Sequence, residues 1–275
     1  MGIDQIETKV SIIIPCHNSG NFLLEAIESC HRSIFSEFEI IVINDGSSEP
    51  ETLDILTQIE SLDKVSVYHQ SNKGASAARN FGVGYSKGEF LLFLDSDNKI
   101  RPDYLTRAFE LFLRNSQLGV VYSRPRFFGT VSNPEERFEV KSFNLDSLLA
   151  GNYIDMCSLV RKKAFLEVGA FDENQELFFG EDWDLWIRIA LSGWEFHFID
   201  EILFDYRIRQ ESLMGQVDEE KQRRTLLYLG TKHGPVIHHR YRQYFRVMDQ
   251  IQKKPFSYFL RILYHRYILG KPFIK

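Results

Sequence analysis

The chain has 275 residues, enough for one large domain or for one domain with an appendage, and its 44% hydrophobic and 26% charged residues are typical of a globular protein. Its three cysteines form no CxxC pair, which argues against a disulfide framework and a zinc cluster and favours a reducing, cytoplasmic compartment. With a net charge of −5, no secretory signal in MGIDQIETKV and no apolar run long enough to cross a bilayer, we expect neither a nucleic-acid partner nor a membrane span.

Short apolar runs alternate with segments of helical spacing through the first hundred residues. This alternation predicts an α/β fold with a Rossmann-like, mostly parallel sheet joined by right-handed crossovers. Ligands of such sheets bind beyond the carboxyl ends of the strands. The expected strands are 10–14, 39–43, 65–69 and 90–94, and the expected helices between them are 20–31, 51–61 and 75–86.

The pattern changes after a further helix expected at about 102–115. The runs 119–130 and 194–209 predict less regular, partly antiparallel strands, with a helix at 182–192 between them. A polar segment over 211–254 is expected to be helical. The sequence therefore predicts a mostly parallel sheet with a small antiparallel part, followed by a C-terminal helical extension.

The fourth expected strand, FLLFL, runs directly into Asp95, Ser96, Asp97 and Asn98. Two carboxylates two residues apart repel each other unless a cation or hydrogen-bond donors lie between them. A Mg²⁺ or Mn²⁺ ion bound by carboxylates and diphosphate oxygens would remove that repulsion and help a diphosphate to leave. The alternative is that the two acids cap a turn and a helix, positions that Asp favours. The motif alone leaves both interpretations open.

Two further loops follow the second and third expected strands. In INDGSS (43–48), Asp45 could accept a hydrogen bond from a nucleobase or a ribose, although Asp-Gly is also a common turn dipeptide. In NKGASAARNFGVG (72–84), Arg79 lies one turn into a helix. Its guanidinium could meet a phosphate or a base, or form a surface salt bridge.

The segment GEDWDLWIRIALSG places Glu181 and Asp182 at the start of an amphipathic helix. One interpretation is that Asp182 is a general base that takes the proton of an acceptor hydroxyl. The other is that the helix dipole stabilises negative charge at a helix N-terminus, which would explain both acids without any catalytic role.

The last forty residues differ chemically from the rest of the chain. Residues 235–275 hold nine basic residues and one acid, a net charge of +8, which leaves −13 on residues 1–234. A final helix expected over 255–269 either lies in the interface of an anionic membrane or packs within the protein or a homodimer. Its basic side is expected to hold Lys254, Tyr258, Arg261 and His265, and its apolar side Phe256, Phe259, Leu260, Leu263 and Tyr267.

Taken in order, these motifs resemble the family 2 glycosyltransferases, which have the GT-A fold. The matching pieces span Val10 to about Ser212 and are VSIIIPCHN, INDGSS, GASAARNFG, FLDSDN, GEDWDLWIRIALSG and YRIRQES. The resemblance implies an inverting transfer of a sugar from a nucleotide diphosphate donor, commonly a UDP-sugar, to the hydroxyl of a saccharide or lipid-linked acceptor, with Mg²⁺ or Mn²⁺. It also implies a setting in cell-surface polysaccharide or glycolipid assembly, in the cytoplasm or on the inner face of the cell membrane.

The resemblance also implies roles for the matching residues. Asp97 would bind the cation directly, and Asp95 would contact the ribose or the hydration shell of the cation. Asp182 would be the catalytic base, with Glu181 next to it. The residues implied on the nucleotide side are Pro15, His17, Asn18, Asp45, which would contact the base, Arg79 and Asp95.

By the same resemblance, residues 1–215 are expected to form the GT-A domain, with a nucleotide-binding half at about 1–116 and an acceptor half at about 117–215. Residues 216–275 form the basic helical extension. One departure concerns Arg209, because many relatives have His at this position and Arg cannot be a neutral metal ligand.

Two other functions remain open. A nucleotidyltransferase shares a similar fold and a metal-bound acidic pair, but it would normally have a basic, Gly-rich loop after the first strand, where this chain has PCHNSGN. A non-catalytic module that binds sugar nucleotides is the second. Retention of Asp95, Asp97 and Asp182 argues against it.

Overall fold

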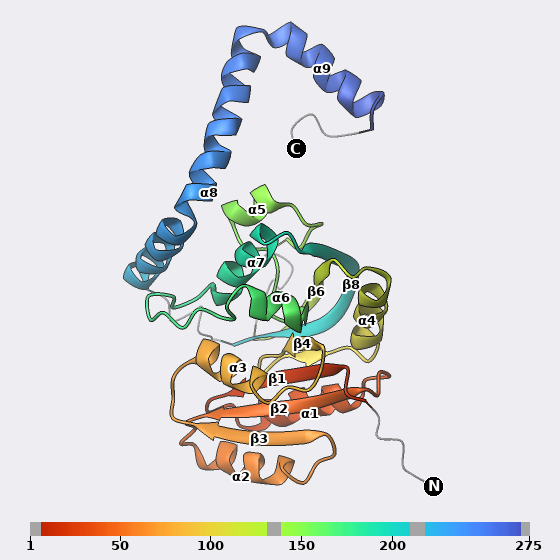
Figure 1. Ribbon diagram of the computed structural model, residues 1–275. Helices are drawn as coiled ribbons and strands as arrows, with labels where there is room; N and C mark the ends of the chain where they lie inside the picture. The colour runs from red at the N-terminus through yellow and green to blue at the C-terminus, as the bar shows by residue number, and fades with distance from the viewer. Residues whose placement is uncertain (1–6, 131–138, 210–217, 271–275) are drawn as a thin grey trace. The chain divides into compact units, whose positions relative to one another are not determined.

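The computed structural model describes residues 7–130, 139–209 and 218–270 and contains an eight-stranded sheet (Figure 1). Its strands are β1 (Val10–Cys16), β2 (Phe38–Asp45), β3 (Val65–Gln70), β4 (Phe90–Phe93), β5 (Lys99–Ile100), β6 (Leu118–Gly129), β7 (Leu159–Arg161) and β8 (Glu195–Ile208). Their order across the sheet is β3-β2-β1-β4-β7-β6-β8-β5. The four strands predicted for the first hundred residues are therefore neighbours.

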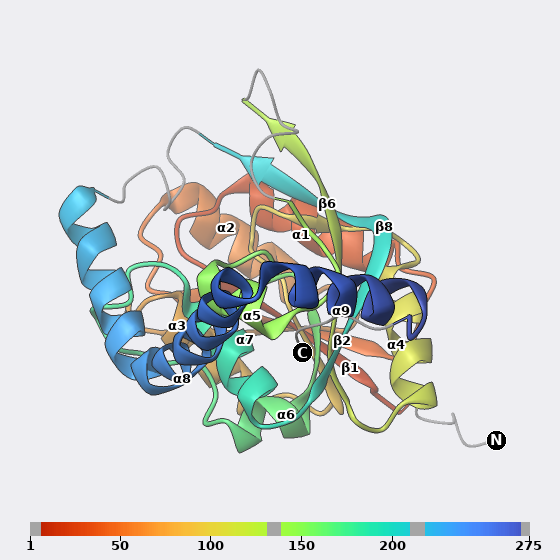
Figure 2. The ribbon, with the colours of Figure 1, turned by 90° about the horizontal axis from the view of Figure 1, so that it is seen from above.

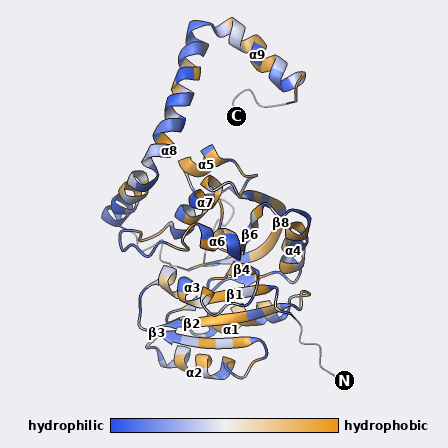
Figure 3. Cartoon of the chain, viewed as in Figure 1, coloured by the Kyte–Doolittle hydropathy of each residue, from blue (hydrophilic) through white to orange (hydrophobic). Residues whose placement is uncertain are grey.

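The first four strands are parallel, as the alternation of strands and helices predicts. Ile12, Ile13 and Ile14 in β1 are fully buried, so side chains on both faces of the strand are covered. Figure 3 shows β1 and β2 as hydrophobic over most of their length. Continuous apolar runs are required here because a parallel sheet is covered on both faces.

Helices cover both faces of the sheet. One core cluster joins Ile12 to α1 (Asn21–His31), α2 (Pro50–Ile59) and α4 (Tyr104–Arg114). A second cluster joins Ile13 to α3 (Ala75–Val83), α5 (Leu145–Ala150), α6 (Lys162–Glu167) and α7 (Glu181–Leu191). The helix α3 lies especially close to the sheet, because a Cβ atom at Gly82 would be 2.7 Å from Ile13 Cγ2. Apolar side chains of helices therefore cover both faces of the sheet.

The antiparallel part of the sheet is formed by β7 and β5. β7 is antiparallel to both β4 and β6, and β5 is antiparallel to β8. The long strands β6 and β8, which run side by side in Figure 2, are parallel to each other with irregularities in register. Because β6 is antiparallel to β7 and β8 is antiparallel to β5, the expectation of less regular, partly antiparallel strands is confirmed. The predicted α/β class and the mostly parallel sheet with a small antiparallel part are confirmed.

Strand direction decides which segments meet at the carboxyl ends of the parallel strands. Because β7 is antiparallel to β4, the loop before β7 (151–158) lies at the edge where β4 ends. Because β6 and β8 both run opposite to β7, the end of β8 reaches this edge as well. We call this edge, with the loops on it, the carboxyl edge.

The predicted helical extension is present as α8 (Glu219–Lys253) and α9 (Pro255–Tyr267). The chain divides into two compact units, Met1–Thr225 and Leu226–Lys275, so the division falls within α8. Residues 210–217, which include the start of the expected 211–254 helix, lie outside the described residues. Among the described helices, none combines the length and the apolar character needed to cross a membrane. The division of residues 1–215 into nucleotide and acceptor halves stays a prediction.

Candidate active site

The loops after β1 and β2 are bound to each other at the carboxyl edge. His17 Nδ1 lies 2.8 Å from the carbonyl oxygen of Asp45. The amide oxygen of Asn18 accepts hydrogen bonds from the backbone N–H groups of Ser48 (2.8 Å) and Glu49 (3.1 Å). His17 and Asn18 therefore hold the INDGSS loop in place, and Pro15 precedes them within β1.

Asp45 fixes a third loop with both of its carboxylate oxygens. Its Oδ1 accepts from Gln70 Nε2 and from the N–H of Lys73, each at 2.8 Å, and its Oδ2 accepts from the N–H of Gly74 at 2.9 Å. The side chain is buried, with 4% of the residue exposed. The next residue, Gly46, has a φ of 69°, which lets the chain turn back immediately after β2. A contact of Asp45 with a base stays a prediction.

Arg79 joins two motifs that are far apart in the sequence. Its Nη2 donates to Asp95 Oδ1 at 2.7 Å, and its Nη1 donates to Glu181 Oε1 at 2.9 Å. Only 4% of Arg79 is exposed, so the interpretation as a surface salt bridge is wrong. The guanidinium thus connects the end of β4 to the start of α7. Its role toward a nucleotide stays a prediction.

We expect Arg79→Ala to destabilise the fold by about 3 kcal/mol, because removal of one partner from a buried ion pair leaves carboxylates uncompensated. The value lies at the low end of the usual range because Asp95 and Glu181 keep some exposure to water. Urea unfolding of the wild type and of the variant measures the difference. Unchanged stability would mean that the two acids do not depend on Arg79.

Asp97 is paired with the end of β8. Its Oδ2 lies 2.9 Å from Arg209 Nε, and its carbonyl oxygen accepts from Arg207 Nε at 3.0 Å. Burial, with a further contribution from the charge of Asp95, raises the pKa of Asp97 to about 6, although the two arginines oppose this shift. The neighbouring Asn98 accepts from the N–H of Arg207 at 2.8 Å. Arg207 and Arg209 therefore hold the DSDN loop against the end of β8.

Asp182 lies at the start of α7, held by two hydrogen bonds. Its Oδ2 accepts from Asn152 Nδ2 at 3.0 Å, and its Oδ1 accepts from the N–H of Trp183 at 2.7 Å. Burial, followed by the charges of Glu181 and Asp155, raises the pKa of Asp182 well above its ordinary value. A carboxylate that binds protons more strongly than a surface Asp is suited to accept one from a hydroxyl group.

The sequence interpretation missed two residues of the site, Asn152 and Asp155. Both belong to the loop before β7, which reaches the carboxyl edge because β7 is antiparallel to β4. Burial, with a contribution from Asp95, raises the pKa of Asp155 to about 7, and Asp155 Oδ1 accepts from the N–H of Cys157 at 2.8 Å. The signal that was available is a carboxylate shortly before a short buried run, the reverse of FLDSDN, in which the carboxylates follow the run.

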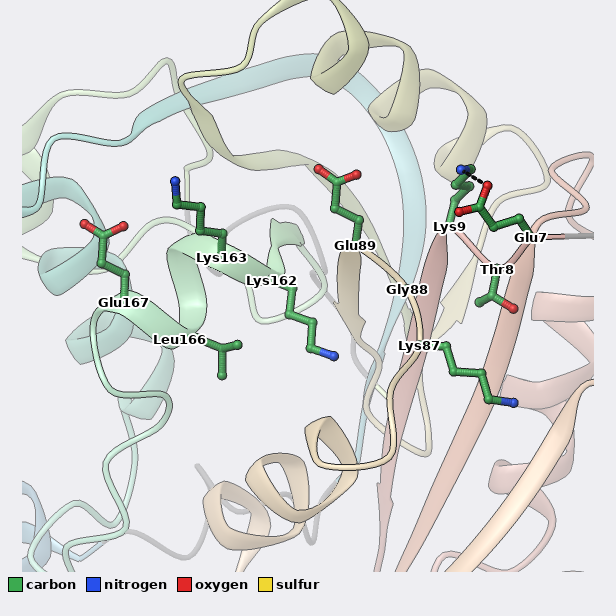
Figure 4. Close-up of a pocket in the computed structure, with 10 residues that line it drawn as sticks. All are labelled: Glu7, Thr8, Lys9, Lys87, Gly88, Glu89, Lys162, Lys163, Leu166 and Glu167. Atoms are coloured by element: carbon green, nitrogen blue, oxygen red, sulfur yellow. Dashed lines mark hydrogen bonds and ion pairs between the residues drawn. The ribbon is translucent and has the colours of Figure 1, made fainter.

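A wide hollow lies at the opposite, amino-terminal edge of the sheet (Figure 4). Its walls carry both lysine and glutamate side chains, including Lys87, Lys162 and Glu89. None of the residues predicted from the sequence for the site lines it. Its mixed charge selects neither an anionic nor a cationic ligand, so the carboxyl edge remains the candidate site.

The fold and the site together define a class. A Rossmann-like, mostly parallel sheet carries the pair Asp95 and Asp97 at the end of a buried strand. The guanidinium of Arg79 links Asp95 to Glu181, which lies at the start of a helix. This arrangement is that of a GT-A nucleotide-sugar transferase fold.

Comparison with known proteins gives the family. The family model described as Glycosyl transferase family 2 matches residues 11–169, more than half of the chain, so the chain belongs to this family. An uncharacterised glycosyltransferase of Rickettsia felis is 28% identical over 234 residues, which cover 82% of this chain and 38% of the relative. This chain therefore spans about two fifths of the length of that relative.

Solved structures show the same fold. The TarS 1–349 structure from S. aureus in complex with UDP-GlcNAc has a TM-score of 0.67 at 21% identity, covering 80% of this chain and 65% of that one. The mannosyltransferase PcManGT from Pyrobaculum calidifontis, in complex with GDP-Man and Mn²⁺, has a TM-score of 0.64 at 14% identity, covering 84% and 68%. At these identities the likeness establishes the fold, and the predicted GT-A fold is confirmed.

Proposed function

We propose that this protein transfers a sugar from a nucleotide diphosphate donor, with a UDP-sugar favoured, to a hydroxyl acceptor with inversion at the anomeric carbon. The observation that carries the proposal is the double ion pair of Arg79 with Asp95 and Glu181. It brings the donor-side carboxylates and the candidate base Asp182 into one cluster at the carboxyl edge, where sheets of this class bind ligands.

In the proposed reaction the acceptor oxygen attacks the anomeric carbon on the face opposite the diphosphate. The bond from that carbon to the diphosphate oxygen breaks, and the diphosphate leaves with the bonding electrons. Asp182 takes the proton of the acceptor hydroxyl, and the hydrogen bond from Asn152 orients its carboxylate. The nucleotide is proposed to lie along the loops that contain Pro15, His17 and Asn18.

The donor set at the carboxyl edge fits Mg²⁺ or Mn²⁺. We propose Asp97 as the direct ligand, with Asp95 acting through the hydration shell. No group of three His, Cys, Asp or Glu residues in the described parts of the chain could hold a metal ion, so diphosphate oxygens would complete the coordination. When bound, the ion supplies positive charge that stabilises the departing diphosphate. The Mn²⁺ in the mannosyltransferase complex supports this proposal.

Asp45 and Arg79 are proposed to act on the nucleotide side mainly by positioning. The carboxylate of Asp45 holds the loop at 70–74, and the guanidinium of Arg79 fixes Asp95. This differs from direct recognition of base and phosphate, which the family resemblance implies. The UDP-GlcNAc bound by TarS and the GDP-Man bound by the mannosyltransferase make both bases worth testing.

A donor panel separates this proposal from its rivals. The protein is incubated with UDP- and GDP-sugars, Mn²⁺ and a set of saccharide acceptors, and the released nucleotide is identified by chromatography. The proposal expects a nucleoside diphosphate whose release rises with acceptor. Pyrophosphate formed from a nucleoside triphosphate and a sugar phosphate would indicate a nucleotidyltransferase, and binding without turnover would indicate a non-catalytic module.

We further propose that the acceptor is a saccharide or a lipid-linked saccharide used in cell-surface polysaccharide or glycolipid assembly, and that the protein works in the cytoplasm or on the inner face of the membrane. The basic extension supports a peripheral contact. Four predicted apolar side chains of α9 are exposed, namely Phe256, Phe259, Leu260 and Tyr267. On the predicted basic side, Tyr258 is buried and hydrogen-bonded to Gln250 of α8.

Vesicle co-sedimentation of the full chain and of a form that ends at Lys254 tests the membrane contact. Each basic residue near an anionic surface contributes about 1 kcal/mol, so the full chain should bind anionic vesicles at low salt and be released as salt rises. The shortened form should bind less. Equal sedimentation of both forms would favour the alternative, a packing or homodimer contact through the C-terminal helices, and size-exclusion chromatography of the two forms would reveal such a dimer.

A further inference from the structure

Arg209 lies beside Asp97, at the position that the proposed function gives to a divalent cation. Its Nε is 2.9 Å from Asp97 Oδ2, so the guanidinium is the counter-ion of the carboxylate to which the proposed function assigns a divalent cation. The side chain of Asp97 is 16% exposed and that of Arg209 is 37% exposed. The pair is therefore open to solvent on the side of Arg209, and an incoming ion or diphosphate can reach it.

The contact between Arg209 and Asp97 is an ion pair without a directed hydrogen bond at Nε. Although the two atoms are 2.9 Å apart, the Nε–H is not aligned with the carboxylate and finds no other acceptor among the described residues. A forked, bidentate contact would be stronger and more specific. The geometry thus holds charge near Asp97 without locking the guanidinium there.

The two neighbouring guanidinium groups are fixed much more firmly. Arg207 donates to Glu25 Oε2 at 2.7 Å and to the carbonyl oxygen of Asp97 at 3.0 Å, and it lies 4.4 Å from the ring centroids of both Phe22 and Phe128. Arg79 donates to Asp95 and Glu181. Among these three arginines, Arg209 is held by the fewest contacts in the described parts of the chain, which are the ion pair with Asp97 and the ring of Phe22 at 5.1 Å from its guanidinium carbon.

We propose that Arg209 occupies the cation position beside Asp97 in the free protein and pairs with the donor diphosphate once the divalent cation has taken that position. The inference rests on the proposed function. Two positive ions that share one carboxylate repel each other, so the free protein should bind a divalent cation weakly. A diphosphate supplies negative charge for both ions, so nucleotide and cation should strengthen each other's binding.

The test compares the wild type with Arg209→Gln in two titrations of the full chain by calorimetry. With Mn²⁺ alone, we expect the variant to bind about tenfold more tightly, because Asp97 loses its competing counter-ion. With UDP and saturating Mn²⁺, we expect the variant to bind UDP about tenfold more weakly, because the cation then lies beside Asp97 and the charge-assisted hydrogen bond from Arg209 to the diphosphate is lost. Effects of opposite sign cannot come from partial unfolding, which would weaken both.

A matched control is Arg101→Gln. Arg101 Nη2 pairs with Asp205 Oδ1 at 3.1 Å, with side-chain exposures of 34% and 12% that resemble those of the Arg209 pair. We expect this variant to leave both affinities unchanged. If Arg209→Gln leaves them unchanged too, or weakens Mn²⁺ binding, the inference is overturned. If the wild type binds no UDP with Mn²⁺ present, the proposed function fails instead, so the two failures can be told apart.

Discussion

Replacing Asp182 by Asn is expected to lower the rate of glycosyl transfer about 10²- to 10⁴-fold while leaving the affinity for UDP unchanged. The amide keeps the size of the side chain and can still meet Asn152, but it cannot take a proton from the acceptor. The rate is measured under saturating donor, and the affinity by calorimetry. Transfer at the wild-type rate would leave Asp182 as an acid stabilised by the helix dipole.

The stability of this variant has a predicted sign. Burial raises the pKa of Asp182 above its ordinary value of 3.8, so ionisation in the folded protein lowers stability as pH rises through the raised pKa. The neutral amide removes that loss. At pH 8 we therefore expect Asp182→Asn to be at least as stable as the wild type, which a melting curve checks. Asp103→Asn, which alters an acid at the start of α4, serves as the control and should change neither rate nor affinity.

Replacing Asp97 by Asn is expected to weaken UDP binding in the presence of Mn²⁺ by roughly 10- to 100-fold. The reason is that an amide is a poorer ligand than a carboxylate for a hard cation. Without Mn²⁺ the variant should bind UDP no more weakly than the wild type, because the guanidinium of Arg209 is freed for the diphosphate. Calorimetric titration of UDP with and without Mn²⁺ measures both values.

A wild type that binds UDP equally well with and without Mn²⁺ would contradict this prediction. Such a result would return the Asp95–Asp97 pair to its alternative interpretation as caps of a turn and a helix. The matched variant Asp205→Asn alters an acid on β8 that is paired with Arg101 and Arg126, and it should keep the dependence of UDP binding on Mn²⁺.

The long, continuous elements of the fold were predictable because their signals are local. Strands that are covered on both faces need uninterrupted apolar runs, and β1, β2 and β4 have them. The two-residue strand β5 and the three-residue strand β7 were missed, because runs this short have no periodicity to detect. Their existence depends on pairing with strands far away in the sequence.

The site was predictable where a motif follows a strand and unpredictable where it depends on topology. Asp95 and Asp97 were found because they end a buried run. Asn152 and Asp155 were missed, because only the antiparallel direction of β7 brings their loop to the carboxyl edge. The sequence also could not reveal that Arg79 is buried between Asp95 and Glu181, since Glu181 is about a hundred residues away.

The central claim is inverting transfer from a nucleotide-sugar donor, and the most direct measurement is the anomeric configuration of the product. The donor identified in the panel is incubated with the full chain, Mn²⁺ and its acceptor, and the new glycosidic linkage is followed by proton NMR. An α-linked donor should give a β-linked product, with one nucleoside diphosphate released per linkage formed. An α-linked product, or release of pyrophosphate in place of the diphosphate, would contradict the account.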